Sequence, residues 1–130
     1  MVNPRKAYPV DSGLIALYNR SEKANTGHAL ETMVLVELRR RHADVHYVHT
    51  KSGREVDFIA RMPSGETQLI QVCADATNSE TADREFRSLI EAAPEYPTAT
   101  RHILTLNRPG PLPAIPEGIL VQTAYEWMLK

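Results

Sequence analysis

Two short stretches of the chain carry polar residues where a β-hairpin would bring them together. Residues 55–59 place Asp57 in an alternating strand pattern, and residues 69–73 do the same for Gln71 and Cys73. Side chains alternate between the two faces of a strand, and facing residues on adjacent strands lie about 5 Å apart. The spacing therefore predicts that Asp57, Gln71 and Cys73 share one face of a sheet.

These three residues offer a carboxylate, an amide oxygen and a thiol. Mg²⁺ prefers oxygen ligands, so the Asp57 carboxylate suits it, whereas Gln71 brings a neutral oxygen and no second negative charge. The Cys73 thiol is a soft ligand for which Mg²⁺ has little affinity, and it cannot act as a cation toward phosphate. These residues therefore offer Mg²⁺ one charged ligand, Asp57, and two poor ones.

The helix that precedes the hairpin must support this face. Thr26 is an expected N-cap, and Leu30, Val34 and Leu38 follow at i, i+4 and i+8 along a helix expected over residues 27–42. Before its basic end this helix has few polar residues, so most of its surface is apolar. We therefore expect it to be buried against a sheet.

The remaining elements can be placed from alternation, turn residues and caps. An extended piece at 6–10 and a short helix ending near residue 19 come first. Strands are expected at 45–50, 54–61, 67–73, 98–106 and 119–121, with helices at 80–92 and 124–129. The strand after the 80–92 helix should lie parallel to one already in the sheet. Within 54–61, Val56 and Phe58 should share a face. The expected class is α/β, with a central mixed sheet flanked by helices.

Length and composition limit the possible functions. The chain has 130 residues, enough for one domain, and its formal net charge of −1 gives no overall basic character of the kind that marks strong nucleic-acid binders. A single cysteine excludes an internal disulfide and a Cys-based zinc site. No apolar run is long enough to span a membrane and no signal core follows the first residues, so we expect a cytoplasmic protein.

The order helix, three-strand meander, helix, strand resembles the core of the PD-(D/E)XK nuclease-like superfamily. Several segments are more closely similar to one branch, the C-terminal domain of unknown function (DUF 4143 type) of bacterial and archaeal AAA-type ATPases. The matching segments are residues 7–14, 27–31, 36–41, 55–58, 70–72, 84–89 and 103–106. We expect residues 1–25 to form a lead-in with a short helix and 26–130 the nuclease-like domain, within one globular unit. The chain has no phosphate-binding loop, so we expect no ATPase activity of its own.

The resemblance implies a role for each site residue. Asp57 would be the central metal ligand, Gln71 would stand where a second carboxylate is usual, and Cys73 would stand at the position of a lysine. Glu31 would be the accessory carboxylate on the first helix. Mg²⁺ would be the cofactor if the site were active.

Other interpretations of these residues stay open. Asp57 can instead accept hydrogen bonds from Arg54 or Gln71, and Glu31 can instead favour the positive end of the helix dipole. Cys73 can be a small buried apolar residue.

Basic residues near the hairpin and at the helix end are candidates for binding nucleic acid. These are Lys51, Arg54, Arg39 and Arg40. A solvated helix end is the competing interpretation for Arg39–Arg41.

Three functions are consistent with the sequence. The first is a nuclease-like domain with a degenerate site that binds nucleic acid or a partner protein, such as an ATPase domain. The second is an active Mg²⁺-dependent nuclease, which the replacements at Gln71 and Cys73 disfavour. The third is a structural or homo-oligomerisation domain, for which exposed apolar surface on an edge strand or the C-terminal segment would be the mark.

Overall fold

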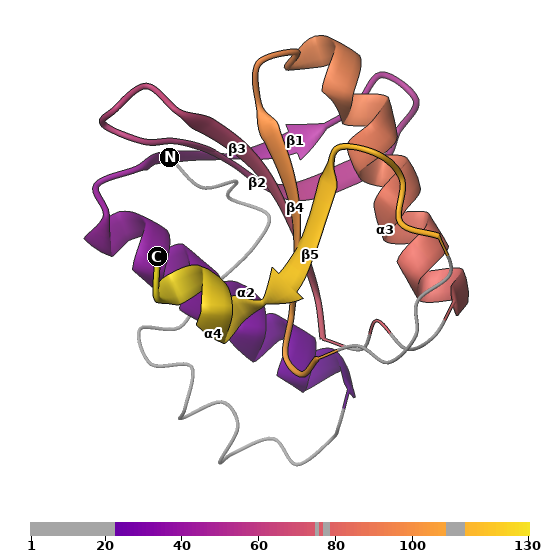
Figure 1. The fold of residues 1–130 in the computed structure, drawn as a ribbon, viewed down its shortest axis with the longest axis horizontal. Coiled ribbons are helices and arrows are strands. Elements are labelled where there is room, and N and C mark those ends of the chain that lie inside the picture. The colour runs from indigo at the N-terminus through magenta and orange to yellow at the C-terminus, as the bar shows by residue number, and fades with distance from the viewer. Residues whose placement is uncertain (1–22, 75, 77–78, 109–113) are drawn as a thin grey trace.

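A five-stranded mixed sheet with helices on both faces forms the fold (Figure 1). The computed structural model describes residues 23–74, 76, 79–108 and 114–130. Its elements are α2 (Lys23–Arg40), β1 (Asp44–His49), β2 (Glu55–Arg61), β3 (Thr67–Cys73), α3 (Ser79–Ala92), the 3-10 helix η1 (Ala93–Glu95), β4 (Thr100–Thr105), β5 (Ile119–Thr123) and α4 (Ala124–Met128). The extended piece and the short helix expected before residue 20 lie outside the described residues.

The strands lie in the order β1-β2-β3-β4-β5. β1, β2 and β3 form an antiparallel meander, whose two turns place Gly53 and Gly65 at φ values of 91° and 94°. Such positive φ values favour glycine, which has no Cβ. β4 pairs with β3 in parallel after the α3 crossover, and β5 pairs with β4 in parallel. The predicted α/β class, with a mixed sheet flanked by helices, is confirmed.

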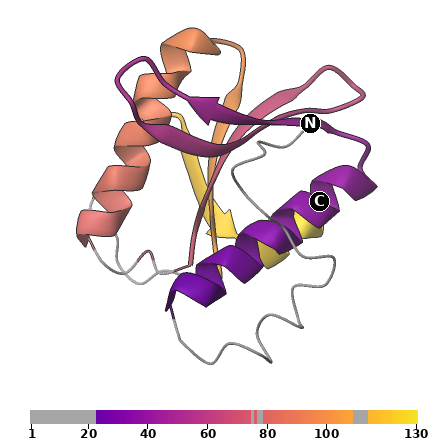
Figure 2. The same ribbon diagram turned by 180° about the vertical axis from the view of Figure 1, so that it is seen from behind.

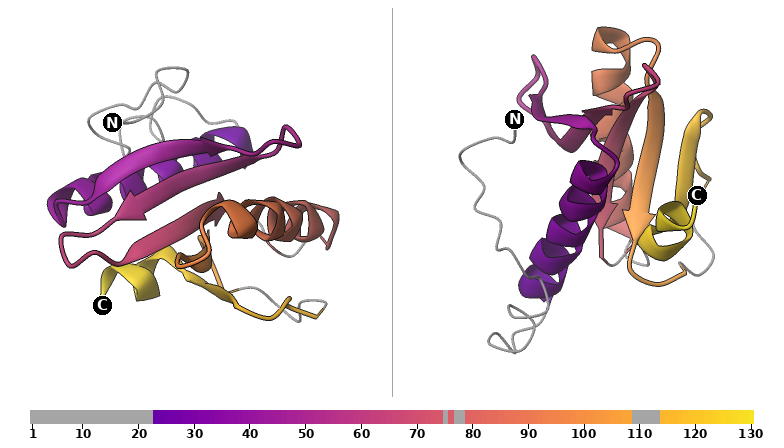
Figure 3. Two further views of the ribbon diagram at one scale, coloured as in Figure 1. Left: turned by 90° about the horizontal axis from the view of Figure 1, so that it is seen from above. Right: turned by 90° about the vertical axis from the view of Figure 1, so that its left-hand side faces the viewer.

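Each face of the sheet has its own apolar core. Helices α2 and α4 cover one face and α3 covers the other, as the views in Figures 2 and 3 show. The core under α2 and α4 includes Leu30, Val34, Leu38, Phe58, Ala60, Ile70, Leu104 and Trp127. The core under α3 includes Val48, Val56, Leu69, Cys73, Ala82, Phe86, Leu89 and Ile103.

Helix α2 differs from the prediction at both ends. It begins at Lys23, so Thr26 lies inside the helix and is not its N-cap. The domain boundary expected after residue 25 therefore falls within α2. The helix ends at Arg40, and His42 adopts a left-handed φ of 59° that turns the chain toward β1. The amide of Ala43 then donates to the Leu38 carbonyl over 3.0 Å, a bond of the kind that closes helix C-termini.

Among the described residues, no helix combines the length and the apolar character that crossing a membrane requires.

Candidate functional site

The β2–β3 ladder opens at Asp57 and Gln71. Regular pairing runs from Arg61 opposite Thr67 as far as Phe58 opposite Ile70, and the next facing pair would be Asp57 and Gln71. Backbone groups that lose their ladder partners need other partners, because an unpaired buried N–H is costly. Side chains supply them here.

Three hydrogen bonds close this opening. The Asp57 amide donates to Oε1 of Gln71 over 2.8 Å, and Nε2 of Gln71 donates to the Glu55 carbonyl over 3.3 Å. The Val72 amide donates to Oδ2 of Asp57 over 2.8 Å. Asp57 and Gln71 thus each bind the backbone of the opposite strand. We call this arrangement the Asp57–Gln71 clasp.

A shift in the β1–β2 register places Asp57 at an irregular point of its strand. The pairing moves by one residue between His46 and Val48, so that Asp57 and Phe58 together face a single residue of β1. Val56 consequently packs in the core under α3, whereas Phe58 packs in the core under α2. The prediction that Val56 and Phe58 share a face is therefore wrong. β-Bulges of this kind redirect side chains and are frequent beside functional sites.

A pocket of about 480 Å³ lies where the two strands open. It is bounded by α2, the β1–β2 turn, the beginning of β2, the end of β3 and the middle of α3. Its lining residues are Glu31, Gly53, Arg54, Glu55, Asp57, Gln71, Val72, Arg84, Glu85 and Ser88. The structure thus brings Glu31, Asp57 and Gln71 to one cavity, together with Arg54. We call it the Asp57 pocket.

Negative charge predominates in the Asp57 pocket. Four carboxylates line it, from Glu31, Glu55, Asp57 and Glu85, against the two guanidinium groups of Arg54 and Arg84. A site of this composition repels a bare phosphate group and attracts cations.

Cys73 does not line this pocket. It is 5% exposed and belongs to the core under α3, where a small closed space bounded by Ala82, Phe86 and Ile103 adjoins it. This is the surrounding expected of cysteine as a small buried apolar residue. Cys73 therefore contributes neither a charge nor a contact to the Asp57 pocket.

Glu31 lies within α2 and not at its beginning. The first turn of α2 contains no acidic residue, because the helix starts at Lys23. The interpretation of Glu31 as a carboxylate at the positive end of the helix dipole is therefore wrong. Glu31 instead lines the wall of the Asp57 pocket.

The β1–β2 turn is fastened to α3 beside the pocket. Glu91 of α3 accepts a hydrogen bond from the Ser52 hydroxyl and forms an ion pair with Nε of Arg54 at 3.2 Å. The Arg54 amide also donates to the Thr50 hydroxyl over 3.0 Å. Arg54 is thus directed by Glu91 at the pocket rim. Lys51 is exposed in the turn and does not line the pocket.

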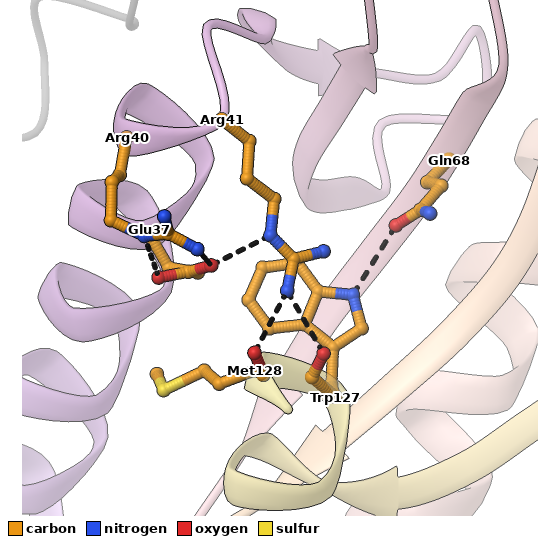
Figure 4. Close-up of polar contacts among 6 residues, drawn as sticks. All are labelled: Glu37, Arg40, Arg41, Gln68, Trp127 and Met128. Carbon is orange, nitrogen blue, oxygen red and sulfur yellow. Dashed lines mark hydrogen bonds and ion pairs between the residues drawn. The ribbon is translucent and has the colours of Figure 1, made fainter. Parts of the chain in front are cut away.

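At the basic end of α2, Arg40 and Arg41 both pair with Glu37 (Figure 4). Arg40 makes two hydrogen bonds to Glu37, of 2.9 and 2.8 Å, and Nε of Arg41 donates to the same carboxylate over 2.6 Å. The Arg40 hydrogen bond is the main cause that lowers the pKa of Glu37 to about 2, and Arg41 adds to it. Arg39 is exposed.

Arg41 also ties α2 to α4. Its Nη2 donates to the carbonyls of Trp127 and Met128 over 3.0 and 3.2 Å, and its guanidinium lies 4.6 Å from the centre of the Trp127 ring. The Trp127 indole in turn donates to Oε1 of Gln68 over 3.3 Å. The sequence left two interpretations of this helix end, phosphate binding and a solvated end. Arg41 fits neither, because it packs on α4.

Several pocket residues come from α3, which the sequence did not single out as part of the site. Arg84, Glu85 and Ser88 lie at i, i+1 and i+4, so one side of the helix carries them to the pocket. The signal available was that residues 84–89 belong to the segments that resemble the family.

The donor set does not fit Mg²⁺. Within the part of the chain that the structure describes, no group of three or more His, Cys, Asp and Glu residues is placed to hold a metal ion. Oδ2 of Asp57 and Oε1 of Gln71 each already accept a backbone N–H. Mg²⁺ demands near-ideal octahedral oxygen geometry, and here it would have to share these two engaged oxygens with the backbone.

Comparison with known proteins identifies the family. A family described as a domain of unknown function, DUF4143, matches residues 26–111. The chain belongs to this family. No curated protein is similar in sequence.

One solved structure supports the fold of this DUF4143 chain. The crystal structure of a repair endonuclease from Pyrococcus abyssi is similar, with a TM-score of 0.50, over 79% of this chain and 47% of that one, at 11% sequence identity. The present chain thus spans less than half of the endonuclease. At this identity the likeness shows the fold alone, which is the nuclease-like α/β fold.

Proposed function

We propose that this nuclease-like domain binds a partner protein within an ATPase system and does not cleave nucleic acid. The Asp57–Gln71 clasp carries the proposal. The side chains at the two positions that the resemblance assigns to metal ligands are engaged in holding β2 and β3 together.

The charges around the clasp also disfavour cleavage. Gln71 contributes no negative charge, and Cys73 is buried away from the pocket. Arg54 is paired with Glu91, so its charge is less available to stabilise a developing phosphate anion. A binding role needs none of these groups to react.

The excess of carboxylates favours a protein partner over nucleic acid. A nucleic-acid backbone brings one negative charge per phosphate, and its affinity comes mainly from contacts with lysine and arginine. The Asp57 pocket presents four carboxylates against two guanidinium groups. An AAA-type ATPase domain is the partner class that the family resemblance supplies.

An experiment with two readouts separates binding from cleavage. Single-stranded and double-stranded DNA and RNA are incubated with the protein and Mg²⁺ or Mn²⁺, and both metals are titrated by calorimetry. We expect no cleavage and no metal-binding heat above background. Metal-dependent cleavage that Asp57→Ala abolishes would overturn the proposal in favour of an active nuclease, a function that the meeting of Glu31, Asp57 and Gln71 in one pocket favours.

Partner binding is tested directly against an ATPase domain. The chain is titrated calorimetrically with an AAA-type ATPase domain taken from a longer family relative, at 50 and 300 mM salt (roughly the range in which phosphate contacts weaken most). We expect saturable binding to the ATPase domain and no salt-sensitive retention of DNA or RNA. The opposite pattern contradicts a protein partner.

One observation favours oligomerisation as a second candidate. Leu120 on the edge strand β5 is 46% exposed, and Tyr125 and Leu129 in the C-terminal segment are 69% and 70% exposed. Sedimentation velocity over a hundredfold range of concentration tests it. A single species at the monomer mass would exclude homo-oligomerisation.

A further inference from the structure

A second pocket lies at the other end of the β2–β3 hairpin from Asp57. Its volume is about 440 Å³, within the range usual for ligand pockets. Two aromatic rings, Tyr47 and Tyr96, line it together with the charged residues Asp44, Arg61 and Glu95. We call it the Tyr47–Tyr96 pocket. Neither the resemblance nor the proposed function assigns it a role.

Both tyrosines are half-buried, and neighbouring groups fix them. Tyr96 follows η1, where its amide donates to the Ala93 carbonyl over 3.1 Å, and its ring packs against the core under α3. The Tyr47 ring lies edge-on to His49, with 6.4 Å between ring centres. The aromatic part of the pocket is thus formed before any ligand arrives.

The charged groups leave the pocket with a negative excess. Two carboxylates, Asp44 and Glu95, stand against one guanidinium, Arg61, and the His46 imidazole also lines the pocket. Nε2 of His46 lies 3.1 Å from Oδ1 of Asp44, and this hydrogen bond is the main cause that lowers the pKa of Asp44. Asp44 is therefore ionised at neutral pH.

Aromatic faces beside carboxylates select for one kind of group. The electron-rich face of a tyrosine attracts a cation, and arginine makes this contact more often than lysine. A guanidinium also stacks on the ring while its N–H fork donates to carboxylates in the same plane. A phosphate group would meet the carboxylates unfavourably, and a neutral ring would gain nothing from their charge.

We propose that the Tyr47–Tyr96 pocket binds the guanidinium of an arginine side chain from the partner protein. This inference rests on the proposed function, and it names the chemistry by which the partner is recognised. The pocket is larger than a guanidinium alone, so the residues flanking the arginine enter it too. The two pockets share no lining residue, so binding here does not fill the Asp57 pocket. Arg61 and Thr67 lie at the opposite ends of β2 and β3 from Asp57 and Gln71, whereas Tyr47 faces Asp57 and Phe58 across the β1–β2 register shift.

Three peptides of one sequence test the proposal. The probes are acetyl-Gly-Ser-X-Ser-Gly-amide with X as arginine, lysine or citrulline, the last being the neutral analogue of arginine. Ring resonances of Tyr47 and Tyr96 are followed by NMR during titration. We expect saturable shifts with the arginine peptide and binding of the citrulline peptide weaker by about tenfold. Equal binding of the arginine and citrulline peptides overturns the proposal. So does the absence of any shift with the arginine peptide up to about 20 mM, the limit of a very weak site.

Variants locate the site on the protein. Glu95 is exposed, so Glu95→Gln removes a pocket charge without disturbing the core, and we expect the arginine peptide to bind about threefold to tenfold more weakly. Glu117→Gln, at an exposed glutamate outside the pocket, is the matched control and should leave affinity unchanged. Equal loss in both variants contradicts a specific site.

A nucleotide titration distinguishes the competing ligand class. Adenosine monophosphate is added under the same conditions. Shifts of the Tyr47 and Tyr96 rings by the nucleotide in place of the arginine peptide assign the pocket to a nucleobase and overturn the arginine proposal. The cleavage assays are independent of these titrations. Failure of the peptide test would leave the non-cleaving function unaffected, and observed cleavage would not decide whether the pocket binds arginine.

Discussion

The side-chain amide of Gln71 binds the backbone of Asp57, with 2.8 Å between Oε1 and the Asp57 nitrogen. The same amide donates to Glu55 on the strand that carries Asp57. Gln71 is only 5% exposed, so both bonds are protected from water. A glutamate here could accept the first bond but could not donate the second. A glutamine at this position is therefore better suited to closing the sheet than a carboxylate would be.

Replacing Gln71 should destabilise the fold. Gln71→Ala leaves the Asp57 amide and the Glu55 carbonyl without these partners, and we expect unfolding to become easier by about 1–3 kcal/mol. Urea unfolding followed by circular dichroism measures the change. Asn107→Ala, at an exposed position, should stay within about 0.5 kcal/mol of the parent. A Gln71→Ala protein as stable as that control would show that the clasp contributes nothing.

Arg41 should matter more than its neighbour Arg39. Arg41→Ala removes the hydrogen bonds to the Trp127 and Met128 carbonyls and the contact with the indole ring, at an expected cost of about 2–4 kcal/mol. Arg41→Lys keeps the charge without the planar fork and should recover only part of this. Arg39→Ala is the exposed control. Equal effects of Arg39→Ala and Arg41→Ala in urea unfolding would contradict the assignment.

Glu37 should make the protein sensitive to strong acid. Its pKa falls from 4.5 to about 2 in the folded state, chiefly through the Arg40 hydrogen bond. A lowered carboxyl pKa stabilises the fold above pH 4.5, and this contribution is lost as the pH falls from about 4.5 to about 2. Unfolding midpoints of the parent and Glu37→Gln should therefore converge over this range. A constant difference between the two proteins across it would exclude the linkage.

His102 should add sensitivity at milder acid. The imidazole is 9% exposed, its Nε2 lies 2.8 Å from the Thr100 hydroxyl, and its Nδ1 is buried without a hydrogen-bond partner. Burial is the largest cause that lowers its pKa from 6.5; Glu66 acts to raise it and Lys130 to lower it. A lowered histidine pKa means that the unfolded chain binds the proton first, so stability falls as the pH drops below about 6.5.

The matched variants for this prediction are His102→Leu and His46→Gln. Stability of the parent should decline between pH 7 and pH 5, whereas His102→Leu should decline less because it cannot take up the proton. His46 is exposed, so His46→Gln should follow the parent. Parallel pH profiles for the parent and His102→Leu would show that His102 is not the group responsible.

Alternation and turn chemistry allowed the sheet to be predicted well. The predicted third strand, 67–73, coincides with β3, because apolar residues mark both faces of that strand and turn residues precede it. The parallel fourth strand followed from the length of its crossover helix. These features depend on local sequence, which is why the sequence alone was enough.

The candidate site was less predictable because it depends on tertiary contacts. Nothing in the alternation of β2 revealed the register shift at Asp57, since a bulge is defined only against the partner strand. Thr26 has the chemistry of an N-cap, yet α2 starts one turn earlier, and this moved Glu31 away from the first turn. Arg84 and Ser88 reach the pocket only through the packing of α3 on the sheet.

The bond between Arg41 and Trp127 joins residues 86 positions apart in the chain. Closing so long a loop costs chain entropy, so we expect this contact to form late in folding, after the intervening strands have assembled. Contacts made after the rate-limiting step govern how fast a protein comes apart, and hardly affect how fast it forms. We therefore expect the contacts of Arg41 with α4 to slow unfolding. Their loss should appear as faster unfolding, with the refolding rate nearly unchanged.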